Sequence, residues 1–196
     1  MERDNVYYVL FEQQKDFREE RIKFIPREIT PKVLSFLHLK LPIVITGVRR
    51  SGKSTLLKIL TQELKLVEKN YLYINFNDER FVSFTPEDFQ KVLEFLEEQN
   101  YEKNSYLLID EIQEVENWEK WIDRIKEKHP IIITGSNSKL LSKEISTILT
   151  GRSISINLYP FSFKEFLKTR MLSFDNYDLD LKLQSKIRTA FSNYLE

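Results

Sequence analysis

Short apolar runs alternate with amphipathic stretches along most of the chain. Five runs, rich in Val, Ile, Leu and aromatic side chains, predict strands that are buried on both faces. They cover residues 41–46, 71–76, 106–110, 131–134 and 153–158. The stretches between them repeat apolar residues every three or four positions, which is typical of helices that cover a sheet. This alternation predicts an α/β fold, a three-layer α/β/α sandwich in which a parallel sheet lies between two layers of helices.

The helices expected between the strands have recognisable start and stop signals. Residues 55–66 are predicted to form a helix directly after a glycine-containing loop. Thr85 is a capping residue, and Pro86 suits the first turn of the next helix. A further helix over residues 139–149 is expected to end before Gly151, because glycine is the usual residue after a helix.

The two ends of the chain follow a different pattern. Residues 1–39 are predicted to be largely helical, with Pro26 and Pro31 as breaks before the first strand. After the fifth strand, residues 163–170 and 179–195 predict two helices and no further strand. We therefore expect an N-terminal helical segment (1–39), a core (40–160) and a C-terminal helical segment (161–196). The last helix keeps its apolar spacing to the final residue without a stop signal, so we expect the natural protein to continue into a further domain.

The segment after the first strand carries the strongest chemical signal. Residues 47–54 read GVRRSGKS and match G-x-x-x-x-G-K-[ST], the phosphate-binding loop of nucleoside triphosphatases. Its glycines permit a tight turn that aims backbone N–H groups at phosphates. Lys53 supplies a cation for the β- and γ-phosphates, and the Ser54 hydroxyl is a ligand for Mg²⁺. The predicted nucleotide contacts are Gly47, Val48, Arg49, Arg50, Ser51, Gly52, Lys53, Ser54 and Thr55.

The end of the third predicted strand supplies a second signal, the acidic pair Asp110 and Glu111. Ligands of open α/β sheets bind at the carboxyl ends of the strands. Asp110 is therefore predicted to hold Mg²⁺, mostly through water, and Glu111 to orient and polarise the attacking water. An acidic pair after a strand is, by itself, also a common solvated turn. Its position downstream of a phosphate-binding loop favours the catalytic interpretation.

Two further residues are weaker candidates. Ser136 follows the fourth strand and is the first choice for a polar side chain between the acidic pair and the γ-phosphate, with Asn137 and Thr134 behind it. Such residues are equally common as helix caps. Arg152 is a candidate to stabilise the charge that develops during phosphoryl transfer, in its own subunit or in a neighbouring one. A surface arginine explains the same residue equally well.

Polar residues also surround the expected site. Asp78, after the second strand, is a weak candidate to position water or metal, and residues 25–27 are candidates to border the base of the nucleotide.

Composition narrows the possibilities. The chain has 196 residues, with 30 Lys and Arg against 30 Asp and Glu, so its formal net charge is zero. This balance gives no support for a nucleic-acid or membrane partner, although a local basic face would still permit nucleic-acid binding. The absence of cysteine excludes disulfides and a cysteine nucleophile, and it fits a reducing, cytoplasmic location. No apolar run approaches the roughly 18 residues of a membrane helix.

Together these motifs resemble the AAA+ superfamily. More narrowly, they resemble the archaeal and bacterial AAA-type ATPases whose core is usually followed by a C-terminal domain of unknown function. The resemblance covers about residues 27–167 and is carried by residues 46–55, 107–113, 133–138, 150–166 and, less specifically, 73–78.

The resemblance implies ATP as the nucleotide and a five-stranded sheet in the order 5-1-4-3-2. It also implies a sensor near Ser136 and Arg152 as a finger. The second arginine sensor that is typical of AAA+ lids has no clear counterpart in this sequence, where Arg188 is the one candidate.

The leading hypothesis is an ATP-binding, Mg²⁺-dependent ATPase of AAA+ type. Its main alternative is a nucleotide-gated switch whose slow hydrolysis times the interaction with a protein partner. A small-molecule kinase is disfavoured by the acidic pair. A DNA-linked regulator would need a further domain to contact DNA, and a homo-oligomer is possible.

Overall fold

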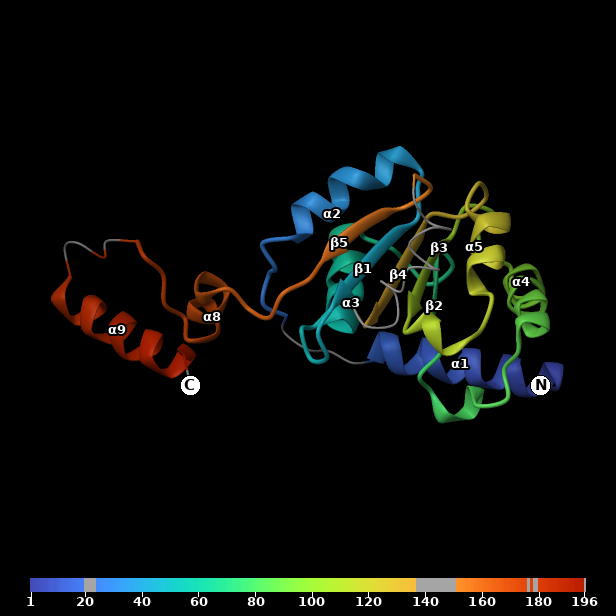
Figure 1. Ribbon diagram of the computed structural model, residues 1–196, viewed down its shortest axis with the longest axis horizontal. Coiled ribbons are helices and arrows are strands. Elements are labelled where there is room, and N and C mark those ends of the chain that lie inside the picture. The colour runs from blue at the N-terminus through green and yellow to red at the C-terminus, as the bar shows by residue number, and fades with distance from the viewer. Residues whose placement is uncertain (20–23, 137–150, 176, 178–179, 196) are drawn as a thin grey trace.

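The computed structural model describes residues 1–19, 24–136, 151–175, 177 and 180–195. A central parallel sheet lies between two layers of helices, and two C-terminal helices extend to one side (Figure 1). The strands are β1 (Ile43–Gly47), β2 (Tyr71–Asn75), β3 (Tyr106–Asp110), β4 (Ile131–Ser136) and β5 (Ile154–Asn157). All strand pairs are parallel, and the order is β2-β3-β4-β1-β5. The predicted three-layer fold and its strand order 5-1-4-3-2 are therefore confirmed.

The helices lie close to their predicted positions. The α-helices are α1 (Arg3–Glu19), α2 (Thr30–Phe36), α3 (Lys53–Glu63), α4 (Phe89–Glu98), α5 (Trp118–Ile125), α8 (Phe163–Thr169) and α9 (Leu181–Leu195). Single 3-10 turns occupy η1 (Leu37–Leu39), η2 (Glu79–Phe81), η3 (Pro86–Asp88) and η4 (Ile112–Glu114). Thr85 caps the η3 turn as expected, in a capping box with Asp88. Pro31, expected to break a helix, instead lies in the first turn of α2, where a missing N–H costs nothing. The predicted helix over 139–149 lies outside the described residues.

The strands β1, β2, β3 and β4 send alternate side chains into two separate cores. In β3, Leu107 and Ile109 pack with α1, α4 and α5, whereas Leu108 packs with α2 and α3 on the other face. This alternation follows from the two-residue period of a strand. Both faces of these four strands are apolar because helices cover both of them, so they read as continuous hydrophobic runs. The edge strand β5 differs from the expected strand buried on both faces, because Ile154 and Ile156 join one core while Ser155 and Asn157 are exposed.

The free edge of β2 is covered by two glutamine side chains of α1. Gln14 accepts from the backbone N–H of Tyr73 at 2.9 Å and donates to its carbonyl oxygen. Gln13 does the same for Asn75, with both distances 3.0 Å. Each amide group replaces one residue of a neighbouring strand, so these backbone groups are satisfied and the edge is closed to other strands.

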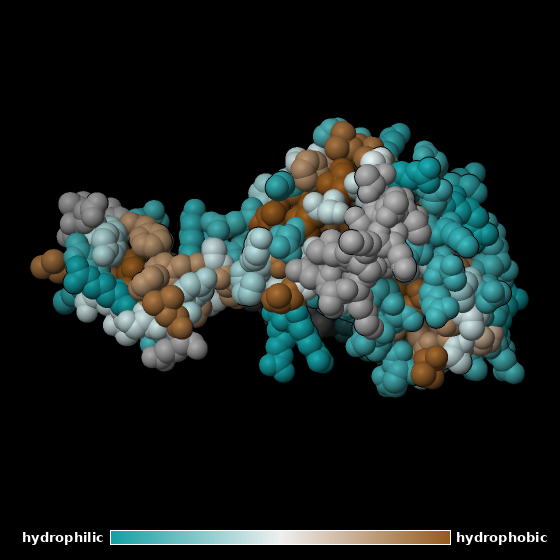
Figure 2. All heavy atoms as spheres, in the orientation of Figure 1, coloured by the Kyte–Doolittle hydropathy of each residue, from teal (hydrophilic) through white to brown (hydrophobic). Residues whose placement is uncertain are grey.

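The helices α8 and α9 pack together through the buried side chains of Leu167, Ile187 and Ala190. Their outer surface mixes polar and apolar side chains, as Figure 2 shows, and Leu181 at the start of α9 is among the exposed apolar residues. Within the described part of the chain, no helix combines the length and the apolar character that crossing a membrane would require.

Candidate functional site

The glycine loop, residues 47–54, connects the end of β1 to the start of α3. Gly52 has φ +92° and immediately precedes Lys53, the first residue of α3. The loop borders a pocket of 380 Å³, the loop pocket, lined by Arg49, Arg50, Gly52, Lys53, Ser54, Thr55, Asn75, Asn77, Asp110 and Glu111. The structure thus brings the loop and the acidic pair together, although they are more than fifty residues apart in the sequence.

The remaining loop residues lie outside this pocket. Val48 is exposed, and Ser51 is buried on the other side of the loop. Gly47 approaches the segment after β5 so closely that a β-carbon there would lie 2.3 Å from the carbonyl oxygen of Leu158. Any side chain at position 47 would therefore displace backbone.

The Lys53 side chain folds back over the loop and is only 6% exposed. Its ammonium donates to the carbonyl oxygens of Gly47 at 3.2 Å and Val48 at 3.3 Å. It also lies 3.7 Å from a carboxylate oxygen of Glu111. The lysine is a cation held at the centre of the loop, where it can attract an anionic group that enters the pocket.

Glu111 occupies a backbone conformation that L-residues seldom adopt. Its φ is 52° and ψ 44°, in the left-handed region. Non-glycine residues in such conformations are concentrated at functional sites. Gln113 donates a hydrogen bond to the second carboxylate oxygen of Glu111. Backbone conformation and these two partners, Lys53 and Gln113, together fix the carboxylate at the rim of the pocket.

Asp110 is almost fully buried, and both of its carboxylate oxygens are oriented. The Tyr73 hydroxyl donates to Oδ2 at 3.1 Å, and the Thr134 hydroxyl donates to Oδ1. Burial, followed by the adjacent Asp110 carboxylate, raises the pKa of Tyr73 well above its usual value, so the tyrosine remains a donor. Asp110 is therefore a fixed acceptor, suited to hold the water shell of a cation.

The oxygen atoms that Ser54 and Asp110 offer at the loop pocket suit Mg²⁺ bound together with a nucleotide. Among the described residues, no group of three or more His, Asp or Glu side chains forms a ready metal site. Mg²⁺ at phosphate-binding loops normally takes one hydroxyl, water and phosphate oxygens, with the acidic residue in support. Ser54 and Asp110 both line the loop pocket and supply the hydroxyl and the carboxylate.

The fourth strand, β4, carries two of the candidate polar residues, Thr134 and Ser136. Ser136 is opposite Gly47 in the β1–β4 register and is partly exposed. Thr134, the lesser alternative, contacts Asp110 directly. Asn137 lies outside the described residues.

Arg152 lies at the opposite edge of the sheet from the glycine loop. Ile154 is level with Ile43, the first residue of β1, while the loop follows the last residue of β1. At about 3.3 Å per residue, Arg152 is roughly 20 Å along the strand direction from Gly47. It is 62% exposed and 3.8 Å from Asp123 of α5. Arg152 therefore lies far from the loop pocket of its own chain, on the solvent-facing side of its contact with Asp123.

Polar residues after β2 divide into two groups. Asn75 and Asn77 line the loop pocket. Asp78 instead pairs with Arg80 at 2.7 Å and accepts from Gln13. The hydrogen bond from Arg80 outweighs the opposing effect of burial and lowers the pKa of Asp78 to about 2. Asp78 therefore belongs to the contact between α1 and the sheet, and the weak metal role considered for it is not supported by its position.

A second pocket, of 620 Å³, adjoins the loop on its other side. It shares Arg50, Gly52 and Thr55 with the loop pocket. Its other lining residues are Ile25, Arg27, Ser51, Pro160, Phe161, Phe166, Asn193, Tyr194 and Leu195. The aromatic and aliphatic lining is of the kind that accepts a planar ring.

Sequence comparison assigns this site to a family. Residues 40–167 match the family model described as the AAA domain, which is most of the chain. The chain therefore belongs to the AAA-domain family of P-loop ATPase-like proteins, as the motifs indicated.

Two relatives from the curated proteins are themselves uncharacterized. An uncharacterized protein of Haemophilus influenzae is 40% identical over 157 residues, covering 77% of this chain and 38% of the relative. An uncharacterized protein of Methanocaldococcus jannaschii is 36% identical over 180 residues, covering 91% of this chain and 36% of the relative. The chain thus spans less than two fifths of the length of either relative.

Solved structures share the fold. A DNA polymerase III gamma subunit-related protein from Thermotoga maritima superimposes with a TM-score of 0.52 at 15% identity, covering 85% of this chain and 57% of that protein. Cdc6p from Pyrobaculum aerophilum gives 0.50 at 14% identity, covering 77% and 51%. At such identities the similarity establishes the fold alone.

Proposed function

We propose that this chain binds ATP with Mg²⁺ at the glycine loop and hydrolyses it to ADP and phosphate. The observation that carries the proposal is the convergence of Lys53, Ser54, Asp110 and Glu111 on one pocket. The loop and Lys53 would bind the β- and γ-phosphates, and the second pocket, lined by Ile25 and Phe161, would hold the base.

In this proposal each residue has a separate task. Ser54 and Asp110 would hold Mg²⁺, which neutralises charge on the phosphate oxygens when bound. Glu111 would accept the proton of the water that attacks the γ-phosphorus, with ADP as the leaving group. Gln113 supports the proposal because its hydrogen bond orients the Glu111 carboxylate in advance.

Paired variants test the assignment. Lys53→Ala should weaken ATP binding at least tenfold, whereas Lys32→Ala, at an exposed position of α2, should not. Glu111→Gln should retain binding and lose turnover, with the exposed Glu116→Gln as its control. Binding is measured by calorimetry with and without Mg²⁺, and turnover by phosphate release. Wild-type affinity in Lys53→Ala would contradict the assignment of the loop.

The pairing of Glu111 with Lys53 also supports a second candidate, a nucleotide-gated switch with slow hydrolysis. The Glu111 carboxylate lies against the loop lysine, so it would have to turn away from Lys53 before it could act on the attacking water. A partner protein or a second copy would then set the rate. In that case wild type and Glu111→Gln would turn over equally slowly in isolation.

The position of Arg152 supports a homo-oligomeric form of the proposal, in which its guanidinium serves the site of an adjacent copy. The turnover per subunit should then rise with protein concentration, and this rise should disappear in Arg152→Ala. A concentration-independent rate that is equal in both proteins would remove Arg152 from the mechanism.

A further inference from the structure

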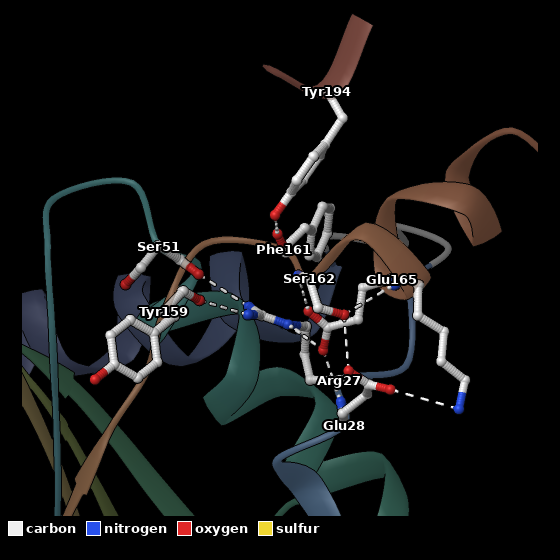
Figure 3. A network of polar contacts seen from close by, with 9 residues as sticks. Arg27, Glu28, Ser51, Tyr159, Phe161, Ser162, Glu165 and Tyr194 are labelled. Carbon is white, nitrogen blue, oxygen red and sulfur yellow. Dashed lines mark hydrogen bonds and ion pairs between the residues drawn. The ribbon is translucent and has the colours of Figure 1, made fainter. Parts of the chain in front are cut away.

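Arg27 is a buried arginine that lies outside the loop pocket and bonds to three separate parts of the chain (Figure 3). Its Nη1 donates to the Ser51 carbonyl oxygen at 2.9 Å and its Nη2 to the Tyr159 carbonyl oxygen at 2.7 Å. Its Nε donates to the Glu165 carboxylate at 3.0 Å. The side chain therefore joins the glycine loop, the segment after β5 and the first turn of α8.

The contact with Ser51 fixes the orientation of one peptide unit of the loop. In a trans peptide the carbonyl and the following N–H point in opposite directions. With the Ser51 carbonyl turned toward Arg27, the Gly52 N–H is turned away from it. Gly52 also lines the loop pocket, beside Lys53. If the 51–52 peptide rotated, a carbonyl oxygen would replace this N–H and would repel phosphate.

The glycine at position 52 is part of the same arrangement. A β-carbon at Gly52 would lie 3.0 Å from Nη1 of Arg27, so the guanidinium packs directly on the loop backbone. The φ of +92° at Gly52 also favours glycine. The guanidinium therefore packs against the loop backbone at Gly52 and leaves little room for a side chain there.

The position of Arg27 depends in turn on Glu165 of α8. The two side chains are 5% and 4% exposed, so each charge relies on its partner. The Glu165 carboxylate also accepts the backbone N–H groups of Glu28 at 2.6 Å and Ser162 at 2.9 Å. The guanidinium further lies 4.9 Å from the centre of the Phe161 ring. A shift of α8 would remove these contacts together and release the guanidinium.

We propose that Arg27 is a positioning residue that holds the 51–52 peptide with the Gly52 N–H directed at phosphate, and that Glu165 makes this orientation depend on the place of α8. The inference rests on the proposed nucleotide binding and adds a residue to it. Arg27 itself is not among the residues that line the loop pocket, so it acts on phosphate through the loop backbone.

The test uses ATP and inorganic triphosphate, which carries the phosphates without the base. Arg27→Lys keeps the charge but cannot span three acceptors, and Glu165→Gln keeps the shape of α8 but removes the counter-charge. Both should weaken ATP and triphosphate at least tenfold and by similar factors. The double variant should be no weaker than the stronger single variant, because the two residues act through one contact.

Glu28→Gln is the matched control. Its exposed carboxylate accepts from Ser162 and lies 3.6 Å from the Lys164 ammonium, whereas the Arg27 guanidinium pairs with Glu165. This variant should leave both affinities unchanged. The chain has only four glycines, so selective ¹⁵N labelling gives a direct readout of the Gly52 amide. Its resonance should move in Arg27→Lys and Glu165→Gln before nucleotide is added, and stay in place in Glu28→Gln.

The outcomes separate this inference from the proposed function. If wild type binds ATP and Lys53→Ala does not, the loop assignment stands whatever Arg27 does. Wild-type triphosphate affinity in Arg27→Lys, even with a lowered melting temperature, would show a purely structural role and overturn the inference. An unmoved Gly52 resonance in Glu165→Gln would overturn the dependence on α8. Failure of the wild type to bind either ligand would overturn both proposals.

Discussion

The ammonium nitrogen of Lys53 lies 3.7 Å from a carboxylate oxygen of Glu111. The cation proposed to bind phosphate and the base proposed to activate water are therefore paired with one another. Phosphate would compete with Glu111 for the lysine. The Glu111 side chain is 26% exposed, which makes this competition sensitive to salt.

Glu111→Gln is accordingly expected to bind ATP as tightly as wild type or up to about fivefold more tightly, since a partly solvated ion pair contributes up to about 1 kcal/mol. The advantage should shrink at high ionic strength. Titrations at 50 mM and 1 M salt check this, with Glu116→Gln as the control. Binding that is weaker than wild type at low salt would show that Glu111 assists nucleotide binding instead of competing with it.

Gly47→Ala is expected to disturb both the fold and the site. The new methyl group would lie 2.3 Å from the Leu158 carbonyl oxygen, and backbone on both sides would have to move. Overpacking of this kind costs about 1–3 kcal/mol or more. Gly151→Ala is the control, because its φ of +73° is strained but nothing lies within 4 Å of the added carbon. Thermal unfolding should show the larger loss for Gly47→Ala. Equal losses would mean that the loop accommodates the methyl group.

The fold could be predicted from the sequence because its signals are local. The apolar runs that became β1 and β3 are short, continuous and bounded by turns, which is the pattern of strands covered on both faces. The glycine loop was predictable for the same reason, since residues 47–54 are contiguous and each has a fixed chemical task.

The supporting residues could not be predicted, because their roles arise only when distant segments meet. Arg27 and Glu165 are 138 positions apart, and Tyr73 appears in the sequence as one more apolar strand residue. Gln13 and Gln14 occur in an amphipathic helix, where glutamine usually faces solvent. One feature of the sequence could have drawn attention to them. Two adjacent glutamines on the buried side of an amphipathic helix need hydrogen-bond partners inside the protein.

Tyr73→Phe is expected to weaken the use of Mg²⁺ while leaving the fold intact. The substitution removes the hydroxyl that donates to Asp110, but it keeps the ring that stacks on Phe17 at 4.0 Å between centroids. One lost hydrogen bond is worth about 1 kcal/mol, which corresponds to a roughly three- to tenfold rise in the Mg²⁺ concentration for half-maximal turnover. Tyr71→Phe, on the same strand, is the control. An equal effect of both substitutions would indicate general loosening of β2.

Gln14→Leu is expected to destabilise the protein and expose the edge of β2. The side chain keeps its bulk, but the N–H and C=O of Tyr73 lose their partners. Each unsatisfied buried group costs about 1–3 kcal/mol. Denaturant unfolding measures the loss, and light scattering should detect association through the uncovered strand. Gln62→Leu, on the exposed side of α3, should produce neither effect. A stable, monomeric Gln14→Leu would show that packing of α1 alone protects the edge.

The attachment of α8 is expected to weaken in acid. Burial alone would raise the pKa of Glu165, but the backbone N–H groups of Glu28 and Ser162, together with Arg27, outweigh it, so the pKa lies below the usual 4.5. A carboxyl group whose pKa is lower when folded stabilises the fold above its unfolded pKa. This contribution is lost as the pH falls through the folded pKa. Wild type should therefore be more stable than Glu165→Gln at pH 7. This difference in stability should shrink as the pH falls below about 4.5. Melting temperatures of both proteins across this range provide the measurement. A difference that persists undiminished at the acid end would mean that the shape of the side chain, and not its charge, holds α8 in place.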